Sequence, residues 1–460
     1  MHRAPLLVSC IIVATSIADA QPAQTPPADQ APPPPAPEPN WAPPLPEEPP
    51  PPPPTDSAGS ATSESTPPAA EPPSESTKPE PESKGSTMEI YGFTMLDIGY
   101  DFGQIGDPNW QDVLRPTKLP SFSDEYGKGG RTFADVKQSR FGVKTDIPTD
   151  YGDIKTVFEF ELFGVGDDAG QTTFRLRHAY GTWKGLRAGQ TWSPFMDPDV
   201  FPDSIEYWGP PGMAFFRNVQ LAYSFYETKD SDFTIALERP GASADSASID
   251  TERFDLTDVV PRFPAPDISA DLKLGTSWGY VRLAGIFRYM AWDDLDPTSP
   301  TVQGHVYGGG ANLSSNIKLA PALIKLQAVY GTAIENYMND ASYDVAPKTD
   351  AVTTPMTLQG VGLPVLGLVG FVDMKWNDFL TSTAGYSLVW IDNSAGQTPD
   401  AFHIGQYALG NLLVHPTKSL MFGAEFQYGR RTNNSDGFSA NDYRIQFSVK
   451  YNFTHTVGGH

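Results

Sequence analysis

The chain has 460 residues and carries 46 prolines, 41 glycines and one cysteine, with 55 acidic residues against 32 basic ones. The resulting formal charge of −23 argues against a nucleic-acid partner, because phosphate backbones are bound by clustered lysine and arginine. The length is sufficient for a core of several hundred residues, so one large domain is expected.

The first 20 residues have the pattern of a secretory signal peptide. A basic start is followed by a mostly apolar run and by the small-residue motif Ala-Asp-Ala at residues 18–20. Cys10 lies inside this run, so the exported chain is expected to contain no disulfide. No other stretch has the roughly eighteen uninterrupted apolar residues of a membrane-spanning helix. Periplasmic proteins and outer-membrane barrels remain as the classes to distinguish.

Residues 21–86 differ in composition from everything that follows them. Proline occupies 24 of these 66 positions, and apolar side chains other than alanine are almost absent. Such a segment cannot bury enough apolar surface to offset its ordering entropy. We expect a disordered Pro-rich segment in the periplasm. It is either a solvated spacer or, as a second hypothesis, a tether that contacts peptidoglycan.

From residue 87 to residue 460, apolar and polar residues alternate with a period of two. The last such run has aromatic or aliphatic residues at odd positions from Tyr443 to Phe453 and polar residues between them. Very short turns and long loops alternate between the runs. The predicted strands are 88–102, 137–147, 152–163, 172–184, 186–193, 216–227, 231–239, 266–277, 279–292, 304–314, 320–333, 366–376, 380–391, 403–415, 418–431 and 441–453.

An even strand number and alternating segments of about ten residues, joined alternately by short and long connections, are typical of outer-membrane barrels. A soluble sandwich is the alternative, but it would not carry an apolar aromatic face on nearly every strand. The sequence therefore predicts an all-β fold, a 16-stranded antiparallel transmembrane β-barrel over residues 87–460. We expect it in the outer membrane of a Gram-negative bacterium, in contact with lipid and lipopolysaccharide, with both chain ends on the periplasmic side.

Basic residues collect on the parity opposite to the apolar residues, which faces the lumen of a barrel. Arg175 and Arg177 are two positions apart on one predicted strand, so they point the same way about 7 Å apart. Neighbouring strands add Arg187 and Lys155 beside them. The predicted pore-lining basic wall consists of Arg140, Lys144, Lys155, Arg175, Arg177, Arg187, Arg282 and Arg288.

The connection after the fifth predicted strand, residues 194–215, is stiffened by five prolines and is rich in apolar and aromatic residues. We expect this third long loop to fold inward and narrow the pore, with its carboxylates facing the basic wall. An extracellular loop stabilised by its own aromatic residues is the alternative. The predicted constriction residues are Asp197, Asp199, Asp203, Glu206, Tyr207 and Trp208.

No motif points to catalysis, to a cofactor or to a bound metal. The histidines after residue 20 show no metal-ligand spacing, and His178 falls on the lipid-side parity. No serine and histidine pair stands out near the predicted outer rim. We therefore expect a channel and not an enzyme.

The sequences RLRHAY at residues 175–180 and AGQTWS at residues 188–193 resemble the DcaP-like outer-membrane porins, with weaker support from YGF at 91–93 and SRFG at 139–142. The resemblance is strongest over about residues 88–225. It implies a trimeric sixteen-stranded channel that favours dicarboxylates and other small organic anions. Two features depart from the pattern: residues 21–86 contain no heptads like those of the amino-terminal coiled coil in some relatives, and seven residues follow Phe453.

The sequence thus predicts an outer-membrane porin, a homotrimer, for passive diffusion of small hydrophilic solutes with a preference for organic anions. One alternative is a nonselective or cation-preferring porin, because the inward Glu159 and Glu161 add to the acidic third loop. The other alternative is an envelope-tethering barrel whose Pro-rich segment is the main functional part.

Overall fold

The computed structural model describes residues 85–107, 110, 112–243, 259–295, 304–348 and 359–458. The predicted signal peptide and the predicted Pro-rich segment up to residue 84 lie outside the described residues. The chain divides into the units Met1–Ser76 and Thr77–His460, and every described residue belongs to the second unit. Within the described residues, no helix is long and apolar enough to cross a membrane.

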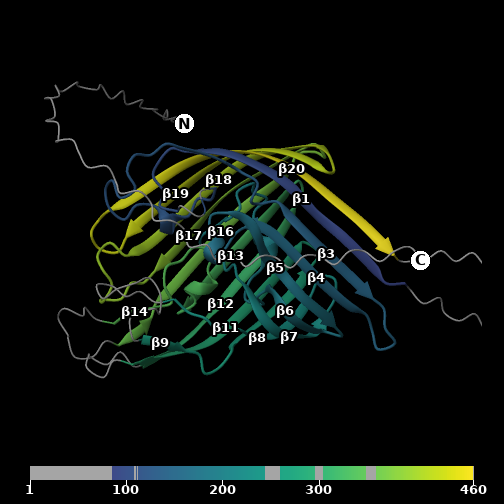
Figure 1. Ribbon diagram of the computed structural model, residues 1–460, viewed down its shortest axis with the longest axis horizontal. Helices are drawn as coiled ribbons and strands as arrows, with labels where there is room; N and C mark the ends of the chain where they lie inside the picture. The colour runs from purple at the N-terminus through teal and green to yellow at the C-terminus, as the bar shows by residue number, and fades with distance from the viewer. Residues whose placement is uncertain are drawn as a thin grey trace, which may run out of the picture. The chain divides into compact units, whose positions relative to one another are not determined.

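The described residues form an antiparallel barrel with sixteen wall positions, which confirms the predicted fold class (Figure 1). Consecutive strands pair with each other, and β1 (Thr87–Asp101) pairs with β20 (Ser439–Gly458) to close the barrel. Closure pairs the two strands that would otherwise be the sheet edges, where hydrocarbon supplies no hydrogen-bond partner.

Two wall positions are each built from two strands in succession. β2 and β3 both pair with β1, and β9 and β10 both pair with β11. The remaining barrel strands and the two segments of each split position are β2 (Arg131–Asp135), β3 (Arg140–Ile147), β4 (Ile154–Phe163), β5 (Thr172–Trp183), β6 (Leu186–Trp192), β7 (Arg217–Glu227), β8 (Asp232–Glu238), β9 (Val259–Arg262), β10 (Asp267–Thr276), β11 (Gly279–Asp294), β12 (Gly304–Leu319), β13 (Ala322–Thr332), β16 (Pro364–Lys375), β17 (Leu380–Ile391), β18 (Phe402–Thr417) and β19 (Leu420–Asn433). Outside the wall, the described part of the chain also forms a small two-stranded sheet and four 3-10 helices: β14 (Val345–Pro347), β15 (Gly360–Gly362), η1 (Pro116–Lys118), η2 (Gly166–Asp168), η3 (Pro198–Val200) and η4 (Glu335–Tyr337).

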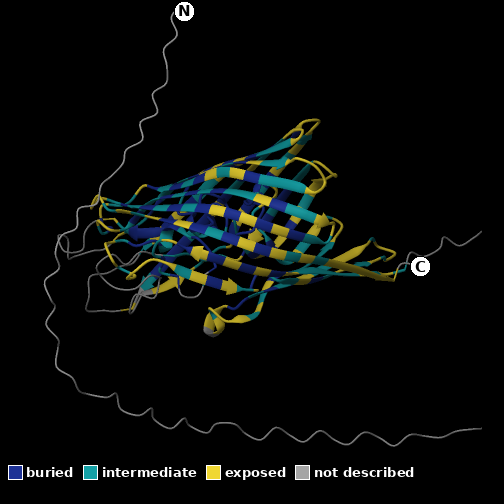
Figure 2. Cartoon of the chain, turned by 90° about the horizontal axis from the view of Figure 1, so that it is seen from above, coloured by how far each residue is buried: buried dark blue, intermediate teal, exposed yellow. Residues whose placement is uncertain are grey.

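Along most wall strands, exposed and buried residues alternate, as Figure 2 shows. On β20, Phe447 is 56% exposed, whereas its neighbours Gln446 and Ser448 are buried. This pattern places the apolar residues outside and the polar residues inside, as expected for strands between hydrocarbon and a polar lumen.

The closing strand differs from its sequence prediction at the carboxyl end. β20 continues through Gly458, and Thr454 to Gly458 pair with Tyr91 to Thr87. Residues 454–458 therefore extend the barrel seam and are not an unpaired tail. The strand continues because β1 offers a free edge as far as Thr87.

The apolar core lies inside the barrel and is built largely by connections that fold into the lumen. Leu114 and Leu119 from the first loop (residues 102–130) cluster with Met196 and Val200 from the third loop (residues 194–215). A second cluster joins the third loop to the connection between β13 and β16 and to the inner wall; its members include Phe195, Ala214, Tyr337, Met338, Val365 and Val389. The inward fold of the third loop is confirmed.

Candidate pore lining

Two glutamates on β4 form ion pairs with three arginines of the predicted basic wall. Glu161 lies 3.5 Å from Nη1 of Arg175 and also binds Arg177. Glu159 accepts a hydrogen bond from Nε of Arg177 at 2.7 Å and lies 3.4 Å from Nε of Arg140. These three arginines therefore share two glutamates in an ion-pair network and are not a row of free guanidinium groups.

The third loop reaches this network through Tyr207. Its hydroxyl donates to Glu161 at 2.5 Å and accepts from Nη1 of Arg177 at 3.1 Å. Arg217, at the start of β7, adds another cation 3.9 Å from Glu161, and its side chain is only 8% exposed. Sequence reasoning missed Arg217 because alternation groups it with the outward Val219. The alternation fails there because the chain leaves the wall between β6 and β7 to form the third loop.

A β-bulge in β5 explains why adjacent residues Arg177 and His178 are both buried. Successive positions of β4 pair with His178 and then with Leu176, so Arg177 is the extra residue on β5. The bulge inverts the parity, and Nδ1 of His178 lies 3.0 Å from Oγ1 of Thr191 on the inner side. The expectation that His178 faces lipid is wrong for this reason.

Arg288 is set apart from the rest of the predicted wall. Its side chain is fully buried and binds Asp267 (Nε to Oδ2, 3.1 Å) and Asp344 (Nη1 to Oδ1, 2.7 Å). Nη1 also donates to the carbonyl oxygen of Ala333 at 2.6 Å. A cation that is buried and paired in this way is not presented to a solute, so we leave Arg288 out of the pore lining.

The lysines of the predicted wall lie nearer the short-turn end of the barrel. Nζ of Lys144 is 4.2 Å from the ring centroid of Tyr91. Nζ of Lys155 is 3.6 Å from Asp146, and the Lys155 side chain is 59% exposed. Both lysines are therefore accessible, in contrast to Arg288.

The first two carboxylates of the third loop face basic residues on β10 and β11. Asp197 is buried, accepts a hydrogen bond from the hydroxyl of Tyr280 at 2.8 Å and lies 3.5 Å from Nη1 of Arg282. Asp199 pairs with Nζ of Lys273 at 2.6 Å. Asp197 thus faces the predicted basic wall at Arg282, whereas neither acid is an ion-pair partner of Arg175 or Arg177.

The later polar residues of the third loop act as anchors. The backbone carbonyl of Asp203 accepts from Nδ2 of Asn411 at 2.7 Å. The Glu206 carboxylate accepts from the backbone N–H groups of Leu114 at 3.2 Å and Gly209 at 2.5 Å. Burial raises the pKa of Glu206 to about 7. Neither carboxylate is among the ion-pair partners of the β5 arginines.

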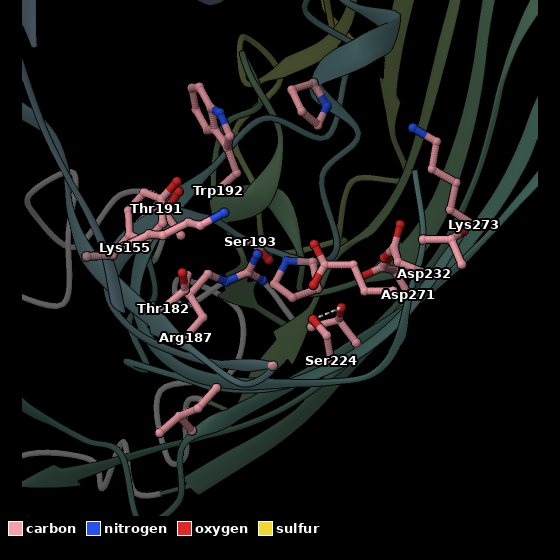
Figure 3. A pocket seen from close by; sticks show the side chains of 18 of the residues that line it. Lys155, Thr182, Arg187, Thr191, Trp192, Ser193, Ser224, Asp232, Asp271 and Lys273 are labelled. Carbon is pink, nitrogen blue, oxygen red and sulfur yellow. Dashed lines mark hydrogen bonds between the residues drawn. The ribbon is translucent and has the colours of Figure 1, made fainter. Parts of the chain in front are cut away.

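A cavity of about 590 Å³ lies between the third loop and the short-turn end of the strands from β4 to β11. Figure 3 shows Lys155 and Arg187 on one side of this cavity and Asp232 and Asp271 on the other. Arg282 also lines the cavity but is paired with Asp271 at 3.1 Å.

Arg187 is the arginine of the predicted wall without a carboxylate partner. No carboxylate oxygen of the described residues lies within 4.0 Å of a guanidinium nitrogen of Arg187. Nη2 of Arg187 reaches Oε1 of Gln220 at 3.4 Å, and its buried Nε has no hydrogen-bond partner. The structure thus leaves one uncompensated guanidinium beside the cavity.

Comparison with known proteins supports both the fold and the sequence resemblance. The DcaP outer membrane protein family model matches residues 74–275, and no curated protein matches the chain. The outer membrane channel DcaP of Acinetobacter baumannii superposes with a TM-score of 0.65 at 20% identity, covering 80% of this chain and 97% of that one.

Two more distant barrels show the same architecture. An anion-selective porin from Comamonas acidovorans superposes with a TM-score of 0.51 at 9% identity, over 80% of this chain and 100% of that one. The OmpT loop L8 deletion mutant, an outer membrane protein of Vibrio cholerae, superposes with a TM-score of 0.50 at 13% identity, covering 80% of this chain and 99% of that one. The chain therefore has the fold of outer-membrane porins, and its resemblance to the DcaP outer membrane protein family is confirmed over residues 74–275.

Proposed function

We propose that this protein is an outer-membrane porin that passes small hydrophilic solutes down their gradients and favours organic anions such as dicarboxylates. The observation that carries this proposal is Arg187, which presents an unpaired guanidinium beside a cavity of about 590 Å³. The Nε of Arg187 is buried without a hydrogen-bond partner, and leaving a buried donor unpaired costs free energy. A carboxylate satisfies a guanidinium with two parallel hydrogen bonds, so an organic anion gains an interaction here that a cation does not.

The surroundings of Arg187 suit transient binding of an anion. Lys155 adds a second, largely exposed cation to the same cavity, and Thr182 and Ser224 add hydroxyl groups. Conduction requires binding that is favourable enough for entry and weak enough for release. Two cations and hydroxyl groups on one side of the cavity, opposite Asp232 and Asp271 on the other, meet that requirement without any chemical step.

The alternative of a nonselective or cation-preferring pore depends on the inward carboxylates. Glu161 is surrounded by Arg175, Arg177 and Arg217, and Glu159 by Arg177 and Arg140. The charges of the two glutamates are therefore offset by salt bridges, whereas Arg187 has no salt bridge and interacts with Asp271 only at longer range. This difference supports anion preference over the alternative.

The proposed location is the outer membrane, with the chain start toward the periplasm. Thr87 pairs with Asp146, next to the short turn between β3 and β4, and with Gly458. In outer-membrane barrels, the end with short turns faces the periplasm. The outward apolar residues then contact lipid and lipopolysaccharide. The proposed homotrimer rests on the family resemblance, and contact of residues 21–86 with peptidoglycan remains a prediction.

The proposal is tested by single-channel recording of the purified protein in a planar bilayer across a potassium chloride gradient. We expect the reversal potential of the wild type to indicate anion selectivity and that of Arg187→Ala to shift toward cation selectivity. The matched control is Arg430→Ala, which removes the same charge from β19 at the parity of the outward Phe426. This control should keep the wild-type reversal potential.

Two results would overturn the anion preference. One is a cation-selective wild type, and the other is an Arg187→Ala variant whose reversal potential equals that of the wild type. Added succinate provides a second readout, because a dicarboxylate that binds in the cavity reduces the chloride current of the wild type more than that of Arg187→Ala.

A further inference from the structure

The barrel wall holds both halves of the third loop, and another loop holds the second half in addition. In the first half, Nδ2 of Asn312 donates to the carbonyl oxygen of Phe195 at 2.8 Å, and Nε2 of Gln446 donates to that of Ile205 at 3.0 Å. Both donors belong to the barrel wall. In the second half, from Trp208 onward, the N–H groups of Gly212 and Ala214 donate to Ser387 and Gln327 of the wall. This half is also bonded to residues 334–344 of the connection between β13 and β16, which we call the clasp segment.

The clasp segment and the third loop form a short antiparallel ladder inside the lumen. Ala214 and Met338 are bridge partners. The backbone N–H of Phe215 donates to the carbonyl oxygen of Tyr337 at 2.9 Å, and that of Asn339 donates to the carbonyl oxygen of Met213 at 2.8 Å. The backbone of the third loop is therefore paired with another loop at this point.

Asn339 extends the ladder through its side chain. Its Nδ2 donates to the carbonyl oxygens of Trp208 at 2.6 Å and Pro210 at 3.0 Å. In return, the indole Nε1 of Trp208 donates to the carbonyl oxygen of Asn339 at 2.8 Å. Asn339 is buried, so these carbonyl groups would lose hydrogen bonds if the amide were removed.

The first loop joins the same assembly through Asp340. This carboxylate accepts from Nε of Arg115 at 3.1 Å and from the backbone N–H of Thr117 at 2.9 Å. The guanidinium of Arg115 also lies 4.0 Å from the ring centroid of Trp208. The three segments thus meet around one tryptophan of the third loop.

The clasp segment is itself fixed to the barrel wall. Asp344 binds Arg288 of β11 at 2.7 Å and accepts from the backbone N–H of Asn336 at 2.9 Å. The hydroxyl of Tyr337 donates to Asp267 of β10 at 3.0 Å. Arg288 therefore has a structural role: it fixes the clasp segment to the barrel wall and does not line the pore.

We propose that the clasp segment positions the second half of the third loop, with Asn339 as a positioning residue, so that the third loop, the clasp segment and the first loop build the constriction jointly. The geometry of the clasp stands independently of the proposed function, which supplies only the electrical readout. Loss of the Asn339 side chain loosens the stretch from Trp208 to Pro210, while Gly212 and Ala214 keep their hydrogen bonds to the wall.

The geometry is tested by a disulfide between the bridge partners, Ala214→Cys with Met338→Cys. Hydrogen bonds flank this antiparallel pair, so its Cα atoms are expected about 4.5 Å apart, within the range that a disulfide spans. Cys10 is the only native cysteine and lies in the predicted signal peptide. We expect the folded, oxidised variant to lose both free thiols to a thiol-reactive label and to recover them on reduction.

The positioning role is tested with Asn339→Ala. We expect higher single-channel conductance, more open-current noise and faster proteolysis within the third loop, with the barrel still folded on a heat-modifiability gel. Adding the disulfide to Asn339→Ala should return all three readouts toward the wild type. The matched control is Asn393→Ala, because Asn393 bonds Gln397 and His403 near its own connection and should leave the three readouts unchanged.

The proposal is overturned if both thiols stay reactive in the folded, oxidised barrel, or if Asn339→Ala keeps the conductance, noise and proteolysis rate of the wild type. A wild type that carries no current contradicts the proposed function alone, since thiol labelling and proteolysis still decide the role of the clasp segment.

Discussion

Arg187 and Arg288 carry the same side chain on inward-facing positions, yet their surroundings give them opposite roles. Arg288 is saturated by two aspartates and by backbone carbonyl groups, whereas Arg187 has one long contact with Gln220. A buried ion pair holds structure together and exerts little net field on a solute. Selectivity of a pore therefore follows from the cations that remain uncompensated, not from the number of cations on the inner face.

Asp112 of the first loop supplies a pH-dependent prediction at the residue scale. Its carboxylate is buried 3.6 Å from Nζ of Lys137, and burial together with the neighbouring Asp135 raises its pKa to about 7. A pKa raised by folding means that the folded state holds the proton more tightly. The protonated Asp112 carboxyl therefore contributes to the free energy of unfolding below about pH 4, and this contribution is lost as the pH rises toward 7.

Asp112→Asn removes this titration. We expect the variant to be more stable than the wild type at pH 8, by roughly 1–3 kcal/mol, because the amide avoids burial of an ionised group. At pH 5 the difference should be smaller than at pH 8, because much of the stability of the protonated wild type is still present there. Urea titration followed by the gel shift of the folded barrel measures both values. A difference that is the same at pH 5 and pH 8 would contradict the assigned titration.

At the element scale, the third loop and β16 approach each other backbone to backbone. A Cβ added at Gly367 would lie 2.1 Å from the carbonyl oxygen of Gly212, and one added at Gly212 would lie 2.0 Å from that of Leu388. Only glycine permits this approach, so the path of the loop along the wall depends on two residues without side chains.

Gly367→Ala is therefore expected to displace the third loop from the wall. The barrel should still fold, since the strand on either side keeps its pairing, while the single-channel conductance changes. Gly410→Ala on β18 is the matched control, because an added Cβ meets no atom within 4 Å there. Equal conductance in the two variants would show that the close approach does not position the loop.

At the scale of the whole molecule, stability depends on the seam between β1 and β20. The seam has fifteen registered pairs, and five of them, from Tyr91↔Thr454 to Thr87↔Gly458, use residues after Phe453. Strand pairs buried in a membrane cannot exchange their hydrogen bonds for water, so each lost pair leaves unsatisfied backbone groups.

Deletion of residues 454–460 is expected to lower the yield of refolded, heat-modifiable barrel. Deletion of residues 459–460 alone is the matched control, because the last registered pair is at Gly458. Refolding yield on a gel, compared between the two deletions at equal protein concentration, provides the measurement. Equal yields would show that the registered pairs from Gly92↔Phe453 to Asp101↔Arg444 suffice to close the barrel.

Much of the fold follows from alternation alone. Apolar residues at every second position of β20 predict its lipid face, and repetition of this pattern predicts sixteen wall strands and the inward parity of Arg187. The prolines and aromatic residues of residues 194–215 predict an inward loop, because such a segment packs better against a wall than it dissolves in water. These properties are local, so the sequence by itself determined them.

The tertiary structure decided what depends on register and on contacts between distant segments. The bulge at Arg177 inverts parity without a local signal, and it brings His178 to the inner side. Pairing with Glu159 and Glu161 compensates the β5 arginines, while Arg187 stays unpaired beside its cavity. The hold of the clasp segment on the third loop joins residues more than 100 positions apart. Alternation specifies which way a side chain points, but only the folded chain specifies what it meets there.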